Sequence, residues 1–139
     1  MKKLILLTGL MAGAVFFLAC DSKSSTTGTV IKSAAAGNNL TASLATSDGV
    51  FKHGKTDFTL SFTDANGKPV DVGAVALTFH MPQMGTMAAM NAPATFMTTN
   101  TPGIYRGSAN VEMAGEWQAK ITYEGPAGTG QATFSITAQ

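Results

Sequence analysis

The sequence predicts an all-β domain, an antiparallel β-sandwich of about seven short strands. From residue 37 onward, apolar and polar residues alternate with a period of two, which is the period of a half-buried strand. Clusters of Gly, Pro, Asn and Asp separate these runs at short intervals. No run shows the period of a long helix, so each strand must bury its apolar face against a second sheet. A small closed barrel is the alternative.

Three strands are expected in the first half of the domain, at residues 40–45, 57–63 and 74–81. Asn66-Gly67 separates the second from the third and supplies the positive φ that a tight turn needs. The apolar face of each strand carries residues at every second position: Leu40, Ala42 and Leu44, then Phe58, Leu60 and Phe62, then Val75, Leu77, Phe79 and Met81.

Four strands are expected in the second half, at residues 95–98, 105–113, 117–123 and 132–136. The first of them is short, and its Met97 is expected in the core or at its rim. Turns at residues 101–103, 114–115 and 125–128 separate the others. The apolar faces of the last three are Tyr105, Ala109, Val111 and Met113, then Trp117, Ala119, Ile121 and Tyr123, then Ala132, Phe134 and Ile136.

The N-terminus has the organisation of a lipoprotein export signal. A basic start is followed by an apolar stretch over residues 4–18, which is shorter than the roughly 20 residues of a membrane span. Phe17-Leu18-Ala19-Cys20 resembles a bacterial lipobox, which implies cleavage before Cys20 and attachment of lipid to it. An ordinary signal peptide cut nearby and an uncleaved anchor are the alternatives.

This organisation divides the chain into three parts. Residues 1–19 are the predicted signal peptide, residues 20–36 are the lipidated Cys20 and a flexible tether, and residues 37–139 are the β-sandwich domain. We therefore expect a protein of the cell envelope, anchored to a membrane by lipid, with its domain facing the periplasm or the cell exterior.

Charge and cysteine content narrow the classes of function. Two of the nine basic residues lie in the signal, which leaves seven against eight acidic residues and no basic patch for nucleic acid. Lipidation of Cys20, the one cysteine, leaves no thiol nucleophile, and His53 and His80 are the two histidines. No nucleophile-elbow motif is present, so we expect a binding protein and not an enzyme. Zinc and blue-copper sites would need cysteine, histidine or carboxylate clusters that the sequence lacks.

Methionine is the residue type that indicates a binding chemistry. Four methionines recur at every third position over residues 81–90, and His80 precedes the first of them. Thioether sulfur is a soft, neutral ligand that selects Cu(I), and a spacing of three is expected to place the sulfurs on one side of a loop or short helical turn. We therefore predict a site for Cu(I) or Ag(I). Its expected ligands are Met84 and Met87 first, then Met81, Met90, His80 and Met113.

Several of these residues also have a packing role to consider. Met81 and Met113 are in phase with the apolar faces of their strands, so both are candidates for the core. Trp117 can fill the core as well, or its indole can lie beside Cu(I) in a cation–π contact. His53 is not expected to be a ligand unless the fold brings it to the methionines.

The order of several short motifs is similar to that of YtkA-like (FixH-related) domains. Asp64-Ala65-Asn66-Gly67-Lys68-Pro69-Val70 follows the strand with Phe58, Leu60 and Phe62, and Met81-Pro82-Gln83-Met84 matches a Met-Pro-x-Met signature. Gly103-Ile104-Tyr105 and Met113-Ala114-Gly115-Glu116-Trp117 follow in the same order. The resemblance spans about residues 38–138. It implies an immunoglobulin-like β-sandwich outside the cytoplasm, and its relatives are linked with copper handling, oxidase assembly and heavy-metal efflux.

Two functions are therefore expected from the sequence. The first is a lipid-anchored protein that binds Cu(I) through its methionine-rich segment for storage, delivery or resistance. The second is an interaction module without metal, in which exposed methionines bind a partner during assembly of a membrane oxidase or an efflux complex. An oxidase, an efflux component or another copper carrier is the expected partner.

Overall fold

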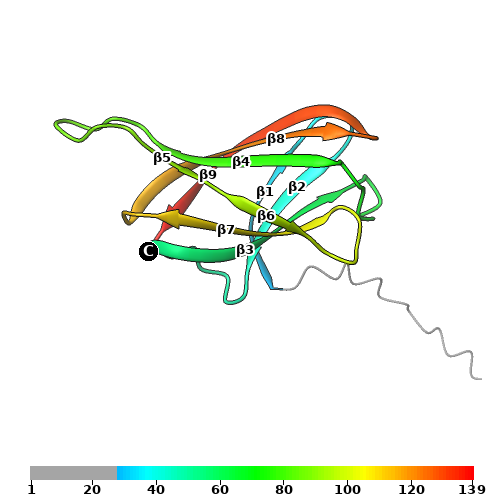
Figure 1. The fold of residues 1–139 in the computed structure, drawn as a ribbon, viewed down its shortest axis with the longest axis horizontal. Coiled ribbons are helices and arrows are strands. Elements are labelled where there is room, and N and C mark those ends of the chain that lie inside the picture. The colour runs from blue at the N-terminus through cyan, green and yellow to red at the C-terminus, as the bar shows by residue number, and fades with distance from the viewer. Residues whose placement is uncertain (1–27) are drawn as a thin grey trace, which may run out of the picture.

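The computed structural model describes residues 28–139 and shows nine strands in two antiparallel sheets (Figure 1). The predicted signal peptide, Cys20 and the start of the tether lie outside the described residues. The strands are β1 (Thr29–Ala35), β2 (Thr41–Thr46), β3 (Gly54–Thr63), β4 (Ala74–Met81), β5 (Met90–Pro93), β6 (Thr95–Thr98), β7 (Ile104–Val111), β8 (Gly115–Gly125) and β9 (Gly128–Ala138).

The order of the strands is that of an immunoglobulin-like sandwich. One sheet has the order β1-β2-β3-β7-β6 and the other has the order β5-β4-β8-β9. Strands β2, β3, β7 and β6 take the places of A, B, E and D in an immunoglobulin domain, and β4, β8 and β9 take those of C, F and G. Strand β5 is an added edge strand beside β4, and β1 is an added edge strand beside β2. The two sheets remain separate, so the fold is a sandwich and not a closed barrel.

Two of the nine strands were not expected from the alternation of apolar residues. Strand β1 lies inside the predicted tether, so the ordered domain begins before residue 37. Its side chains are exposed or half-buried, because only one neighbour, β2, pairs with this edge strand. Strand β5 is four residues long and ends at Pro93, a residue that sheets accept at an edge.

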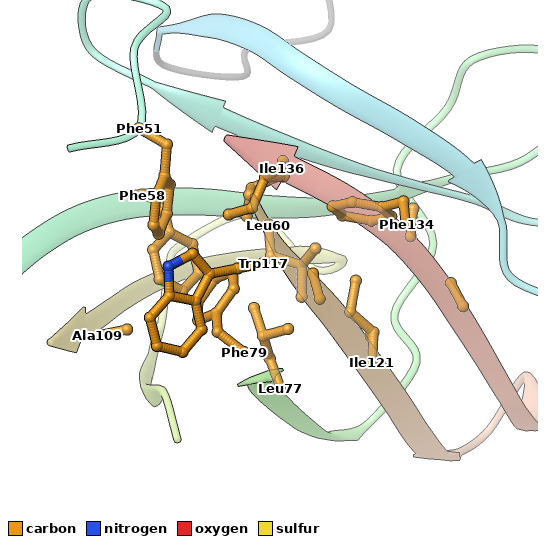
Figure 2. Close-up of a cluster of buried hydrophobic side chains, with 14 of the residues drawn as sticks. Phe51, Phe58, Leu60, Leu77, Phe79, Ala109, Trp117, Ile121, Phe134 and Ile136 are labelled. Carbon is orange, nitrogen blue, oxygen red and sulfur yellow. The ribbon is translucent and has the colours of Figure 1, made fainter. Parts of the chain in front are cut away.

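The core lies between the sheets and is rich in aromatic rings (Figure 2). Phe58 of β3 and Phe79 of β4 meet edge to face across the two sheets, with ring centroids 5.8 Å apart. Phe51 packs against both, and the buried indole of Trp117 lies beside Phe79 in the same cluster. Trp117 therefore fills the core, which is one of the two roles considered for it.

Candidate metal centre

The methionine-rich segment is a β-hairpin that joins β4 to β5. In Figure 1 this green loop projects beyond the end of both sheets. Residues 82–89 are all exposed. The hairpin therefore holds its side chains in solvent, at the end of the sandwich where β4 ends and β8 begins.

The tip of the hairpin is a two-residue turn closed by Met84 and Met87. The amide of Met87 donates to the carbonyl of Met84 at 2.9 Å, and the amide of Met84 donates to the carbonyl of Met87 at 3.2 Å. Gly85 has a φ of 56°, and Thr86 does not share a positive φ, which is the pattern of a type II′ turn. Glycine at this position avoids the strain that a β-carbon would cause at such a φ.

The four methionines form two cross-strand pairs about this turn. Met84 lies opposite Met87, and Met81 lies opposite Met90. Two residues lie between the two pairs on each arm, 82–83 on one and 88–89 on the other, so the register does not slip between them. Side chains of opposed residues lie on one face of a hairpin, and successive residues alternate between faces. The pair Met84–Met87 therefore takes the face opposite to the pair Met81–Met90.

This arrangement corrects the expectation that a spacing of three places all four sulfurs on one side. That expectation holds for a helical turn, whereas the segment folds as a hairpin with a period of two. The exposed fractions of the side chains also differ between the two methionine pairs. Met84 is 56% exposed and Met87 is 40% exposed, whereas Met81 is 2% exposed and Met90 is half-buried. The structure thus presents Met84 and Met87 together to solvent and packs Met81 into the core.

Met113 lies at the same end of the sandwich, in the turn between β7 and β8. Strand β7 ends at Val111, two residues earlier than expected, so Met113 leaves the apolar face of the strand and is 37% exposed. Its carbonyl accepts a hydrogen bond of 2.9 Å from Nε1 of Trp117, which fixes the turn to the core. A β-carbon added to Gly115 would lie 3.2 Å from Cε of Met81, so the turn packs against the base of the hairpin.

His80 is directed away from Met81, as the alternation of the strand predicts. Its Nδ1 lies 2.7 Å from Oδ1 of Asn91, the residue opposite it on β5. With Nδ1 as the donor, the lone pair of the neutral ring is on Nε2, which is the form that binds a metal. At about 3.3 Å per residue, however, the Cα atoms of His80 and Met84 are about 13 Å apart along the strand. The fold does not bring His80 to the Met84–Met87 pair.

His53 also lies at this end, because it precedes β3 at the position where Gly54 pairs with Val111. Its Nδ1 lies 2.7 Å from the carbonyl oxygen of Gln139, and its amide donates to the same oxygen. These contacts hold His53 beside the end of β9, not on the hairpin.

Met97 is separate from the hairpin. It lies on the edge strand β6 opposite Arg106 and is 73% exposed, in contrast to the expected place in the core or at its rim. It lines an open hollow of about 450 Å³ together with Asp57 and Thr59. An edge strand of four residues has one face in solvent, and Met97 is on that face, while its neighbour Phe96 packs against the core.

Two residues that serve this region were not singled out from the sequence. Gly85 allows the turn that pairs Met84 with Met87, and Asn91 holds the ring of His80. The signal for the first is the symmetric arrangement of the four methionines about Gly85-Thr86, which is a Gly-x turn of the hairpin type. The role of Asn91 can be recognised only when the register of the hairpin is known, because that register places Asn91 opposite His80.

Within residues 28–139, no group of three or more His, Cys, Asp or Glu side chains is placed to hold a metal ion. Met84 and Met87, opposed across the hairpin turn, offer two soft thioether donors on paired positions. Over the same residues, no helix has the length and apolar character needed to cross a membrane.

The fold and the exposed methionine pair define an immunoglobulin-like β-sandwich domain with a projecting methionine hairpin. A family model described as YtkA-like matches residues 34–122, a span that runs from β1 into β8 and includes the whole hairpin. The chain belongs to the YtkA-like family. No curated protein and no solved structure matches it.

Proposed function

We propose that this protein binds Cu(I), or Ag(I), through the thioethers of Met84 and Met87 and stores or transfers the ion in the cell envelope. The observation that carries the proposal is the pairing of these two residues across the tip of an exposed hairpin. Two opposed residues of a hairpin have their β-carbons about 5 Å apart, so both flexible side chains can reach one ion between them.

The chemistry of the pair suits a soft ion that must be released again. Neutral thioethers select Cu(I) over harder ions. Because they carry no negative charge, they bind the cation weakly enough for it to be released. All eight residues from 82 to 89 are exposed, so a partner can reach the ion without opening the core. Met113, in the neighbouring turn, is the next candidate for a third ligand, and Met90 follows it because Met90 is half-buried at the base of the hairpin and shares the face of Met81. Met81 and His80 rank after them because Met81 is buried and His80 is remote from the tip.

The lipobox-like sequence that ends at Cys20 bears on the place of this protein in the cell. We propose that it is a lipoprotein, anchored through Cys20, whose domain faces the periplasm or the exterior. The role is that of a carrier and not of an enzyme. A membrane oxidase, an efflux component or another copper carrier would receive or supply the ion.

The test is a Cu(I) titration of the purified full chain in competition with a chromophoric Cu(I) chelator. We expect the double variant Met84→Leu/Met87→Leu to bind Cu(I) at least about tenfold more weakly than the parent, a difference of ~1.4 kcal/mol. Leucine preserves apolar volume and removes sulfur. Met97→Leu is the matched control, because Met97 is the most exposed of the described methionines and lies on another strand. Equal affinity of the double variant and the parent would contradict the proposal.

The alternative function, an interaction module without metal, is favoured by the same exposure. Met84, Met87 and Met113 are exposed apolar side chains at one end of the sandwich, and adaptable methionines suit partner binding. The double leucine variant separates the two functions. A module of this kind would keep its partner in the variant, and its parent would bind no Cu(I) in the titration.

A further inference from the structure

The described methionines differ widely in their access to solvent. Met97 is 73% exposed and Met84 is 56% exposed, whereas Met81 is 2% exposed. Oxidation of a thioether follows access to the oxidant, so one chain contains both reactive and protected sulfurs. The reactive sulfurs include the two that close the hairpin.

We propose that Met84 and Met87 form an oxidation-sensitive pair, and that conversion of either to methionine sulfoxide switches off metal binding. This inference rests on the proposed function for its second part. The oxidant is a peroxide. A lone pair of the thioether sulfur attacks one peroxide oxygen, the O–O bond breaks, and hydrogen peroxide gives the sulfoxide and water. Sulfur loses two electrons and the peroxide gains them.

The effect on the metal follows from the change of donor. A sulfoxide presents a polar oxygen in place of an accessible soft sulfur, and Cu(I) favours the soft ligand. Because two sulfurs make the site, the loss of one leaves a single thioether at the tip. The fold itself does not depend on these side chains, since both lie among the exposed residues 82–89 and outside the core. Oxidation therefore removes the ligand set and leaves the sandwich intact.

The coupling works in both directions. A bound Cu(I) or Ag(I) ion occupies the lone pair that would attack the peroxide, so metal protects Met84 and Met87. Met97 lies on β6, away from the hairpin, and gains no protection. Sulfoxides are reduced by methionine sulfoxide reductases, one enzyme for each epimer, so the switch is reversible.

The experiment treats the purified full chain with hydrogen peroxide, with and without Ag(I), and measures oxidation at each methionine by peptide mass spectrometry. Ag(I) is used because it does not itself cycle with peroxide as copper does. Without metal, we expect Met84 and Met87 to oxidise at least about tenfold faster than Met81. With Ag(I), their rates should fall severalfold while that of Met97 does not change. The oxidised chain should no longer bind Ag(I), and treatment with both reductases should restore binding.

The outcomes separate this inference from the proposed function. If Met84 and Met87 oxidise no faster than Met81, the oxidation-sensitive pair is ruled out and the metal site stands. If they oxidise rapidly but the oxidised chain still binds Ag(I) as before, the switch is ruled out. If the parent binds no Ag(I) and gains no protection, the proposed function fails while the sensitivity of the two sulfurs remains. Circular dichroism of the oxidised chain and of Met84→Gln/Met87→Gln, a mimic of the sulfoxide, must show an intact fold; unfolding would contradict a ligand-based switch.

Discussion

At one end of the sandwich, tyrosine hydroxyls tie separate loops together, whereas at the other end the methionine hairpin extends into solvent. The hydroxyl of Tyr123 in β8 donates to the carbonyl of Ala36 at 2.9 Å and accepts from Nδ2 of Asn38 at 3.1 Å. The hydroxyl of Tyr105 in β7 donates to the carbonyl of Gly73 at 3.0 Å, just before β4. In the outer part of the hairpin, the backbone hydrogen bonds join Met84 only to Met87.

The difference between the two ends indicates that one end of the domain contributes to the stability of the fold, whereas the other end carries the side chains available for binding. The tyrosine end joins β1, β4, β7 and β8 through buried or half-buried hydrogen bonds, which resist local opening. At the methionine end, the side chains of Met84 and Met87 are exposed and lie outside the core. Changes at the first end should therefore affect stability, and changes at the second should affect binding.

The largest effect on stability in this comparison is expected from Tyr123→Phe. The change removes one bond to a buried carbonyl and one from Asn38, while the ring remains against Phe62. A loss of about 1–3 kcal/mol is expected in the free energy of unfolding. Urea denaturation followed by the fluorescence of Trp117, the single tryptophan, measures it. No loss would mean that the hydroxyl does not join the loops.

An intermediate effect is expected at Tyr105 and depends on pH. Burial, together with the negative charge of Asp71, raises the pKa of the Tyr105 hydroxyl above its usual value of 10.0. A group whose pKa is raised by folding stabilises the folded state fully below its unfolded pKa, and this contribution is lost as pH rises beyond it.

We therefore expect stability to fall above about pH 10 and expect Tyr105→Phe to reduce that fall. At neutral pH the same substitution should cost about 1 kcal/mol, because the bond to Gly73 is lost. Urea denaturation of both proteins between neutral and alkaline pH provides the comparison. If the free energy of unfolding of the variant falls by the same amount at alkaline pH, the pH dependence comes from groups other than Tyr105.

The smallest effect on stability is expected at the methionine end. Met84→Leu/Met87→Leu should change the free energy of unfolding by no more than about 0.5 kcal/mol, because both side chains are exposed. Thermal and urea denaturation of the metal-free double variant measure it. A loss comparable to that of Tyr123→Phe would show that the hairpin tip is part of the packed structure, and the division between the two ends would not hold.

The sequence was sufficient to predict the sandwich because large apolar residues alternate through most of the strands. Phe58, Leu60 and Phe62 of β3 and Trp117 and Ile121 of β8 all lie in the core, as their spacing indicates. Strand β1 carries no such signal. It is an edge strand in which Val30 is 48% exposed, so its pairing depends on β2 and not on its own pattern.

The sequence was sufficient to name the methionines of the candidate site, but not to predict how the fold places them relative to one another. The sequence indicates that Met84 and Met87 lie outside the alternating strands, and the structure shows both exposed. A spacing of three nevertheless fits two conformations, a helical turn and a hairpin centred on Gly85-Thr86, and these place the four methionines differently. The hydrogen bond between the ring of His80 and Asn91 depends on how the strands pair, and so does the end of β7 at Val111, which leaves Met113 outside the strand. A single sequence does not specify this pairing.

The most direct test of the account is an NMR titration of the full chain, labelled with ¹³C at the methionine methyl groups, with Ag(I). We expect the methyl signals of Met84 and Met87 to shift together as the site fills, and those of Met81 and Met97 to stay in place. Single leucine substitutions assign each signal. Binding of Ag(I) that leaves Met84 and Met87 unshifted, or that shifts Met97 equally, would contradict a metal site at the tip of the hairpin.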